Sequence, residues 1–119
     1  QLTQIVNPEA RETPGVSWSE IALALARLEP ETCPAIILSE TVPGSYIQCA
    51  GSRERLTVEL RLYTSEKFKH FVIGHANNKG WHEVVWDTIE CSSGPIRVHD
   101  TEVLQLDDAV ALFNVFFNA

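Results

Sequence analysis

An unbroken alternation of apolar and polar side chains runs from Leu56 to Tyr63, and no other stretch constrains the fold as strongly. Successive side chains of a β-strand point to opposite faces, so a period of two predicts a strand that buries one face. The apolar set is Leu56, Val58, Leu60 and Leu62, and the opposite set is Thr57, Glu59, Arg61 and Tyr63. The pattern therefore predicts a core face and leaves open what the polar face meets.

Five further stretches are typical of strands, and short links join them. Residues 45–51 precede the alternating strand, and the short polar loop between the two predicts an antiparallel hairpin. The other candidates are 35–40, 68–75, 81–91 and 96–103. Because consecutive strands with short links usually pair with each other, we expect an antiparallel meander.

Two amphipathic helices bracket these strands. Ser17 and Glu20 form an S-x-x-E capping box and Pro30 stops the helical pattern, so we expect a helix over 17–29. A stripe at helical spacing predicts a second helix over 105–118; its members are Leu106, Ala109, Val110, Phe113, Phe116 and Phe117. The expected fold class is α+β: an antiparallel sheet of five to six strands with an N-terminal and a C-terminal helix packed on one face.

A chain of 119 residues fits one domain. Residues 1–15 are polar and contain Pro8 and Pro14, which is typical of a loop that leads into a fold. Within them, residues 1–6 could add an edge strand. We therefore interpret 1–15 as a polar N-terminal segment and 16–119 as a single α+β domain.

The second face of the sheet needs a cover that the two helices do not supply. Strands 68–75 and 81–91 carry apolar residues on both faces, and such strands are usually covered on both. A partner or a second subunit would cover this face. A sheet that curls and closes on itself is the alternative, and the sequence favours neither.

The charge of the chain limits its partners. The net charge is −7, from 16 acidic and 9 basic residues, which argues against a nucleic-acid-binding surface. It favours a basic protein partner, because opposite potentials steer association. A modest negative charge also serves solubility alone. The acidic loop residues Glu29, Glu31 and Glu40 are candidates for the steering role.

Cysteine spacing and hydropathy indicate the compartment. Cys33, Cys49 and Cys91 are widely spaced and form no C-x-x-C motif, which favours a reduced, cytoplasmic protein. Cys49 shares the apolar face of its strand with Ile47, so we expect a buried, inert thiol. No apolar run approaches the ~20 residues that span a bilayer, so we expect no membrane association.

The sequence gives little support for catalysis or for a cofactor. Glu59 and Arg61 share one strand face, but such a pair is more often a weak surface ion pair than catalytic machinery. The four histidines show no H-x-H or H-E-x-x-H spacing; they are His70, His75, His82 and His99. We therefore expect no enzyme, no metal and no cofactor.

Several short motifs occur along the chain, and their order is informative. They are Ser17, Trp18 and Ile21; Tyr46 to Gly51; Val58, Glu59 and Arg61; His70; and Val103 to Phe113. Together they span residues 17 to 117, and their order resembles small bacterial immunity-type proteins encoded beside polymorphic or contact-delivered toxins. Cys49 departs from the branched or small residue that this pattern has there, which bears on packing more than on function.

The resemblance implies a non-catalytic inhibitor that binds a cognate toxin domain and uses no cofactor. It also implies that Gln48, Glu59 and Arg61 hold the scaffold through cross-strand hydrogen bonds. We expect the partner-binding surface to include Tyr46, Gln48, Glu59, Arg61, Tyr63 and Trp86. The sequence also allows a homodimer.

Two other function classes fit the same sequence. An acidic secretion chaperone would form a stable homodimer and bind an unfolded segment of its partner. A small ligand-binding or enzymatic domain would need a deep pocket with convergent polar groups.

Overall fold

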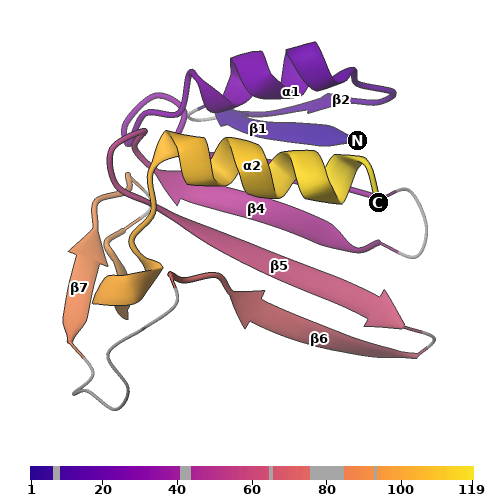
Figure 1. The fold of residues 1–119 in the computed structure, drawn as a ribbon. Coiled ribbons are helices and arrows are strands. Elements are labelled where there is room, and N and C mark those ends of the chain that lie inside the picture. The colour runs from indigo at the N-terminus through magenta and orange to yellow at the C-terminus, as the bar shows by residue number, and fades with distance from the viewer. Residues whose placement is uncertain (7–8, 41–43, 65, 76–84, 93) are drawn as a thin grey trace.

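The computed structural model describes residues 1–6, 9–40, 44–64, 66–75, 85–92 and 94–119 (Figure 1). Within them, two helices lie on one face of a six-stranded antiparallel main sheet, and β7 and β8 form a separate small sheet. The main sheet runs in the order β2, β1, β3, β4, β5, β6. The expected α+β class, with both helices on one face, is confirmed.

The bounds of the elements are as follows. The strands are β1 (Leu2–Val6), β2 (Glu9–Thr13), β3 (Ala35–Ser39), β4 (Tyr46–Gly51), β5 (Leu56–Thr64), β6 (Lys67–Val72), β7 (Trp86–Ile89) and β8 (Ile96–His99). The helices are α1 (Trp18–Leu25) and α2 (Leu106–Phe117), with a 3₁₀ turn at Asp100–Glu102.

The N-terminal residues build two strands, and this differs from the sequence expectation. β1 pairs with both β2 and β3, so it is interior to the sheet and not an edge strand. Its Leu2 lies opposite Leu38, and both side chains are buried. β2, expected as loop, is the actual edge strand, and its residues are almost all exposed. Because β2 is held by ladder hydrogen bonds and buries little, it shows no apolar alternation to predict it from.

The first helix begins where the sequence predicted and ends earlier. The Glu20 amide donates to the Ser17 hydroxyl at 3.3 Å, and the Ser17 amide donates to a Glu20 carboxylate oxygen at 3.2 Å. The helix stops at Leu25, because the amides of Arg27 and Leu28 donate to carbonyls three residues back and tighten the last turn. The expected bound at residue 29 is therefore wrong: the chain has left the helix before it reaches Pro30.

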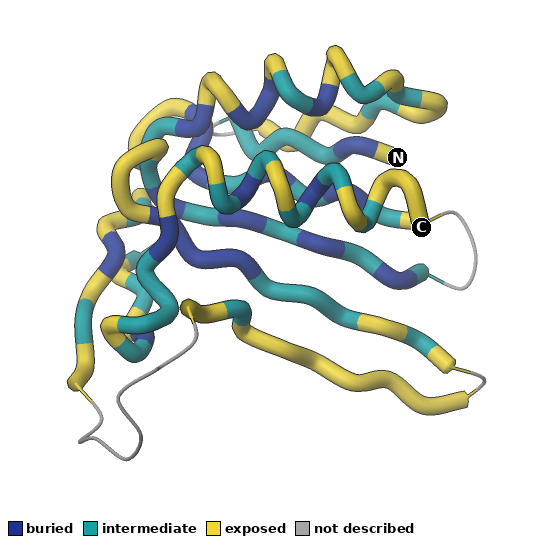
Figure 2. The backbone as a smooth tube through the Cα atoms, in the orientation of Figure 1, coloured by how far each residue is buried: buried dark blue, intermediate teal, exposed yellow. Residues whose placement is uncertain are grey.

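The core lies between the helices and the main sheet. The apolar faces of the two hairpin strands meet as expected, and the register places Ile47 opposite Leu60 and Cys49 opposite Val58. Phe113 is fully buried on the inner side of α2. The cover thins toward the other edge: Leu62 is 39% exposed and β6 is exposed along its whole length (Figure 2). The expectation that Leu62 lies beneath the helices is wrong, because the helix layer ends before that part of β5.

The last two strands leave the main sheet, which corrects the expected meander. β7 pairs with β8, and the 3₁₀ turn then carries the chain back so that Leu104 bridges Leu56. Arg55 ties this small sheet to the main one, since its Nη2 lies 2.8 Å from an Asp87 carboxylate oxygen. The predicted strand over 81–91 is described only from residue 85, so Trp81, His82 and Val84 lie outside the described residues. No described helix is long and apolar enough to cross a membrane.

Candidate functional site

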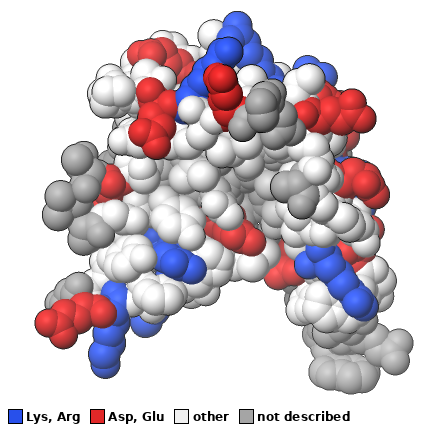
Figure 3. Space-filling view, turned by 180° about the vertical axis from the view of Figure 1, so that it is seen from behind, with Lys and Arg blue, Asp and Glu red and all other residues white. Residues whose placement is uncertain are grey.

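Among the described residues, no helix lies on the face of the main sheet opposite α1 and α2, which we call the open face. In the described part of the chain, β2 and β6 each pair with one neighbour, so the sheet does not close on itself. Figure 3 views this side, which is hollowed between the projecting β5–β6 end of the main sheet and the small sheet. Of the two covers considered from sequence, a closed sheet is excluded for these residues. The second face of the main sheet is therefore a surface that no described helix covers.

Five of the six predicted binding residues lie together on this face. The register places Tyr46 opposite Arg61 and Gln48 opposite Glu59, with Tyr63 further along β5. The next strand adds two residues, because Arg61 also faces His70 and Tyr63 faces Phe68. We call these seven the open-face cluster: Tyr46, Gln48, Glu59, Arg61, Tyr63, Phe68 and His70.

A polar chain crosses three strands within the cluster. The Gln48 amide nitrogen donates to Glu59 Oε2 at 2.7 Å, and His70 Nε2 lies 3.5 Å from the same oxygen. Arg61 Nε donates to His70 Nδ1 at 3.2 Å. A nitrogen that accepts a hydrogen bond carries no proton, so the proton of the neutral ring is on Nε2, toward the carboxylate. Gln48, Glu59 and Arg61 thus make the cross-strand hydrogen bonds that the resemblance implied.

The same chain fixes the guanidinium of Arg61 among aromatic rings. Its central carbon lies 4.3 Å from the centroid of the Phe68 ring and 5.6 Å from that of Tyr46. The rings of Tyr63 and Phe68 are also in contact, with centroids 5.6 Å apart. Stacking and the hydrogen bond at Nε orient the arginine, whose guanidinium is a planar donor fork.

Trp86, the sixth predicted residue, lies elsewhere. It is on β7 of the small sheet, where it is 53% exposed. Its ring meets the edge of the His99 ring at 4.7 Å, and the guanidinium of Arg97 lies 4.7 Å from its centroid. The sequence grouped Trp86 with the hairpin because strand 81–91 was expected in the same sheet.

Phe68 and His70 were missed as members of the site. Their positions follow from where β5 ends and β6 begins, because a shift of one residue in that turn would move both to the other face. The alternation in residues 68–73 is apolar on both sides, so it gives no register of its own. Only a known turn length between Thr64 and Lys67 would have placed them.

One of the acidic loop residues has a local role. Glu29 Oε2 accepts from the Thr32 amide at 2.8 Å and from the Glu31 amide at 3.1 Å. The hydrogen bonds from Thr32, amide first and hydroxyl second, lower the pKa of the Glu29 carboxyl. Glu29 therefore organises a tight turn, whereas Glu31 and Glu40 are exposed.

No group of three or more His, Cys, Asp and Glu side chains in the described ranges could hold a metal ion; His82 lies outside those ranges. Cys49 is fully buried, and burial raises the pKa of its thiol to about 12, so it stays protonated at neutral pH. The described histidines face carboxylates: His75 lies 3.6 Å from Asp108, and His99 lies 3.9 Å from Glu102.

Comparison of the chain with protein-family models, with curated proteins and with solved structures finds no match. The case for a function therefore depends on the geometry of the open face and on the motif order in the sequence.

Proposed function

We propose that this chain is a non-catalytic immunity-type protein that neutralises a cognate toxin domain by binding it on the open face of the main sheet. One observation carries the proposal. On a face of the main sheet over which no described helix lies, the guanidinium carbon of Arg61 is 4.3 Å from the centroid of the Phe68 ring and 5.6 Å from that of Tyr46. Tyrosine and arginine are among the residues that supply most of the binding energy at protein interfaces, and the open-face cluster contains Arg61, Tyr46 and Tyr63.

Arg61 is already restrained before a partner binds, and this makes the arrangement favourable for recognition. Immobilising a long side chain at an interface costs about 0.5–1.5 kcal/mol. Arg61 is already restrained by the His70 acceptor and by two rings, so little of that cost is left for the bound state. The fork matches a carboxylate of the partner.

Charge acts over a longer range than the cluster itself. The net charge of −7 attracts a partner that is basic overall and raises its association rate. A basic toxin domain that presents one carboxylate to Arg61 would satisfy both conditions. We place the action of the protein in the cytoplasm, since its three cysteines are widely spaced and form no C-x-x-C motif.

The test is co-expression with the product of the neighbouring open reading frame, followed by a pull-down and a titration of the complex. Arg61→Ala should weaken binding about 30-fold or more, the loss of a hot spot worth ~2 kcal/mol. Arg97→Ala is the matched control, because it removes an arginine stacked on an aromatic ring of the other sheet. Glu59→Gln keeps an acceptor for Gln48 and should leave binding largely unchanged.

Three results would contradict the proposal. Protection of cells without a complex would show that neutralisation does not act through binding, and turnover of a small substrate would favour the enzymatic alternative. Binding to an unfolded partner segment by a stable homodimer would favour the secretion chaperone. Loss of binding in Arg97→Ala with none in Arg61→Ala would move the interface to the small sheet.

A further inference from the structure

Helix α2 has a second apolar stripe that the core of its own chain covers only in part. Its inner face packs on the core through Ala109 and Phe113. The second stripe is Ala111, Leu112, Val115, Phe116 and Ala119, at the spacing of one helical face. Val115 in the middle is 71% exposed. A helix that is apolar on most of its circumference is typical of a helix with neighbours on two sides.

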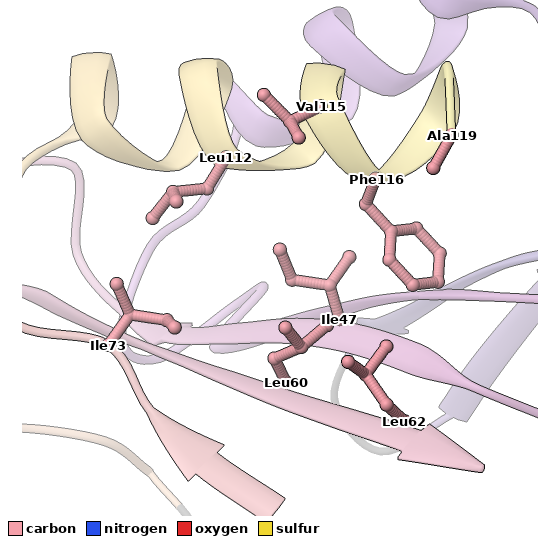
Figure 4. Close-up of a pocket in the computed structure, with 8 residues that line it drawn as sticks. All are labelled: Ile47, Leu60, Leu62, Ile73, Leu112, Val115, Phe116 and Ala119. Atoms are coloured by element: carbon pink, nitrogen blue, oxygen red, sulfur yellow. The ribbon is translucent and has the colours of Figure 1, made fainter. Parts of the chain in front are cut away.

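This stripe forms one wall of a groove on the helix side of the main sheet (Figure 4). Ile47, Leu60 and Leu62 form the floor, while Leu112, Val115 and Phe116 form the wall, around a volume of about 250 Å³. A second hollow of about 250 Å³ continues from it past Ile73 and Leu112 to Asp108. The two share Ile73 and Leu112, so the groove follows α2 for most of its length.

The dimensions of the groove fit one more helix. From Asp108 to Phe117, where α2 ends, an α-helix rises about 14 Å, or between two and three turns. The helices α1 and α2 already lie side by side on the sheet, and β5 and β6 continue beyond α2 without a helix over them (Figure 1). A third helix at the usual ~8–10 Å from α2 would lie over this part of the sheet.

The rim opposite α2 is basic, against the net charge of the molecule. Lys69 is opposite Leu62 and Lys67 is opposite Thr64, so both lysines are on the groove side of β6. Both are exposed, and neither makes an ion pair with a described residue. The occupant thus meets apolar side chains at its centre and two cations along one flank.

We propose that this groove docks an amphipathic helix of another protein, about three turns long, with an apolar ridge and an acidic flank toward Lys67 and Lys69. The site is on the opposite side of the main sheet from Arg61, so it is a second binding surface, independent of the proposed toxin-binding face. The protein could then hold two partners at once.

A second copy of the chain fits the groove less well. Leu112 and Phe116 are partly buried against the core of their own chain. A second copy would therefore offer mainly Ala111, Val115 and Ala119, which are too short to form a ridge. Pairing of β6 with another β6 would bring together two strands that each carry Lys67 and Lys69. Lysines on an edge strand are a common protection against such self-pairing.

The probe is a synthetic helix-forming peptide of about 16 residues, with leucines at i, i+4, i+7 and i+11 and glutamates along one flank. Its affinity for the full chain is measured by calorimetry. Val115→Glu should weaken binding about tenfold or more, because it places a charge in the groove. Since the Val115 side chain is highly exposed, we expect this variant to fold normally. Leu23→Glu, at a 53% exposed position on α1, is the matched control and should change nothing.

A charge swap tests the rim. Lys69→Glu should weaken binding of the acidic peptide and strengthen binding of the same peptide with lysines in place of its glutamates. Arg61→Ala should leave both unchanged, which separates this surface from the open face. The proposal is overturned by no saturable binding up to about 1 mM, by equal affinity of both peptides for the native chain, or by unchanged binding in Val115→Glu. The free protein could instead self-associate, and Val115→Glu could abolish that self-association. This result would show that the groove binds a second copy of the chain.

Discussion

Gly51 marks the point where the small sheet rests on the main one. Its φ is +122°, and a Cβ there would lie 2.5 Å from the Arg55 carbonyl oxygen and 2.7 Å from Ile89 Cγ2. Both are closer than real Cβ atoms come, and the oxygen is backbone that a rotamer change cannot move. No other residue type fits this position without displacing the β4–β5 turn or β7.

The substitution Gly51→Ala should therefore lower the free energy of unfolding by about 2 kcal/mol or more. Gly94→Ala is the control, since Gly94 has nearly the same φ, +125°, and nothing within 4 Å of the added Cβ. The difference between the two variants in urea denaturation isolates the clash from the backbone strain. Equal losses would mean that neither the Arg55 carbonyl oxygen nor Ile89 lies this close to Gly51.

At the residue level, the sequence predicted which β4 and β5 residues lie on the open face, but it did not predict which β6 residues join them. Strict alternation in β5, with its partner β4 one short loop away, was enough to put the polar residues of the hairpin on one face. The structure adds the register, which pairs Gln48 with Glu59 and Tyr46 with Arg61. It could not supply Phe68 and His70, whose face depends on a turn length. It also could not show that Arg61 would stack on Phe68, because that contact joins strands whose register was unknown.

At the level of elements, α2 is the piece on which the helix layer depends. Phe113 is 0% exposed at the centre of its inner face. Phe113→Ala should cost about 3–5 kcal/mol, the loss of a buried ring together with the cavity it leaves. Val115→Ala, on the exposed stripe of the same helix, should stay within about 1 kcal/mol. Chemical denaturation measures both, and a small loss in Phe113→Ala would show that α2 is not docked by its inner face.

Elements were predictable where their ends or their apolar period is encoded locally. The capping box fixed the start of α1, and the stripe fixed α2 to within a residue at each end. β2 was not predictable, because an exposed edge strand is selected by its neighbour β1 and not by burial. The small sheet was missed for a related reason: nothing in the alternation of β7 says which strand it pairs with.

For the whole molecule, the main sheet separates two unlike surfaces. The open face carries a restrained arginine with polar and aromatic neighbours, and the helix face carries an apolar groove with a lysine rim. The overall dimensions of the Cα trace, 43 × 36 × 24 Å, are those of a thin two-layer body, in which few residues separate one surface from the other. The same strands therefore form the open face on one side and the floor of the groove on the other, and a partner on either side contacts them.

The stability of the whole molecule should depend on pH in the alkaline range through one core residue. Burial raises the pKa of Cys49 from 9.0 to about 12. Below pH 9 both the folded and the unfolded chain keep this proton, so the thiol contributes its full stability. Between pH 9 and about 12 the unfolded chain loses the proton and the folded chain does not. The free energy of unfolding should then fall by about 1.4 kcal/mol per pH unit on this account.

The measurement compares the wild type with Cys49→Val in urea at pH 8 and pH 10.5. Other titrating groups, including Cys33, whose pKa burial also raises, act in both proteins and cancel in the difference. Valine is close to cysteine in size, so the packing cost of the substitution is small. Because valine does not ionise, that cost is the same at both pH values. We expect the wild type to lose about 2 kcal/mol relative to the variant between the two pH values. A difference that does not change with pH would mean that the thiol reaches water in the folded protein, and that the core beneath α2 is open at β4.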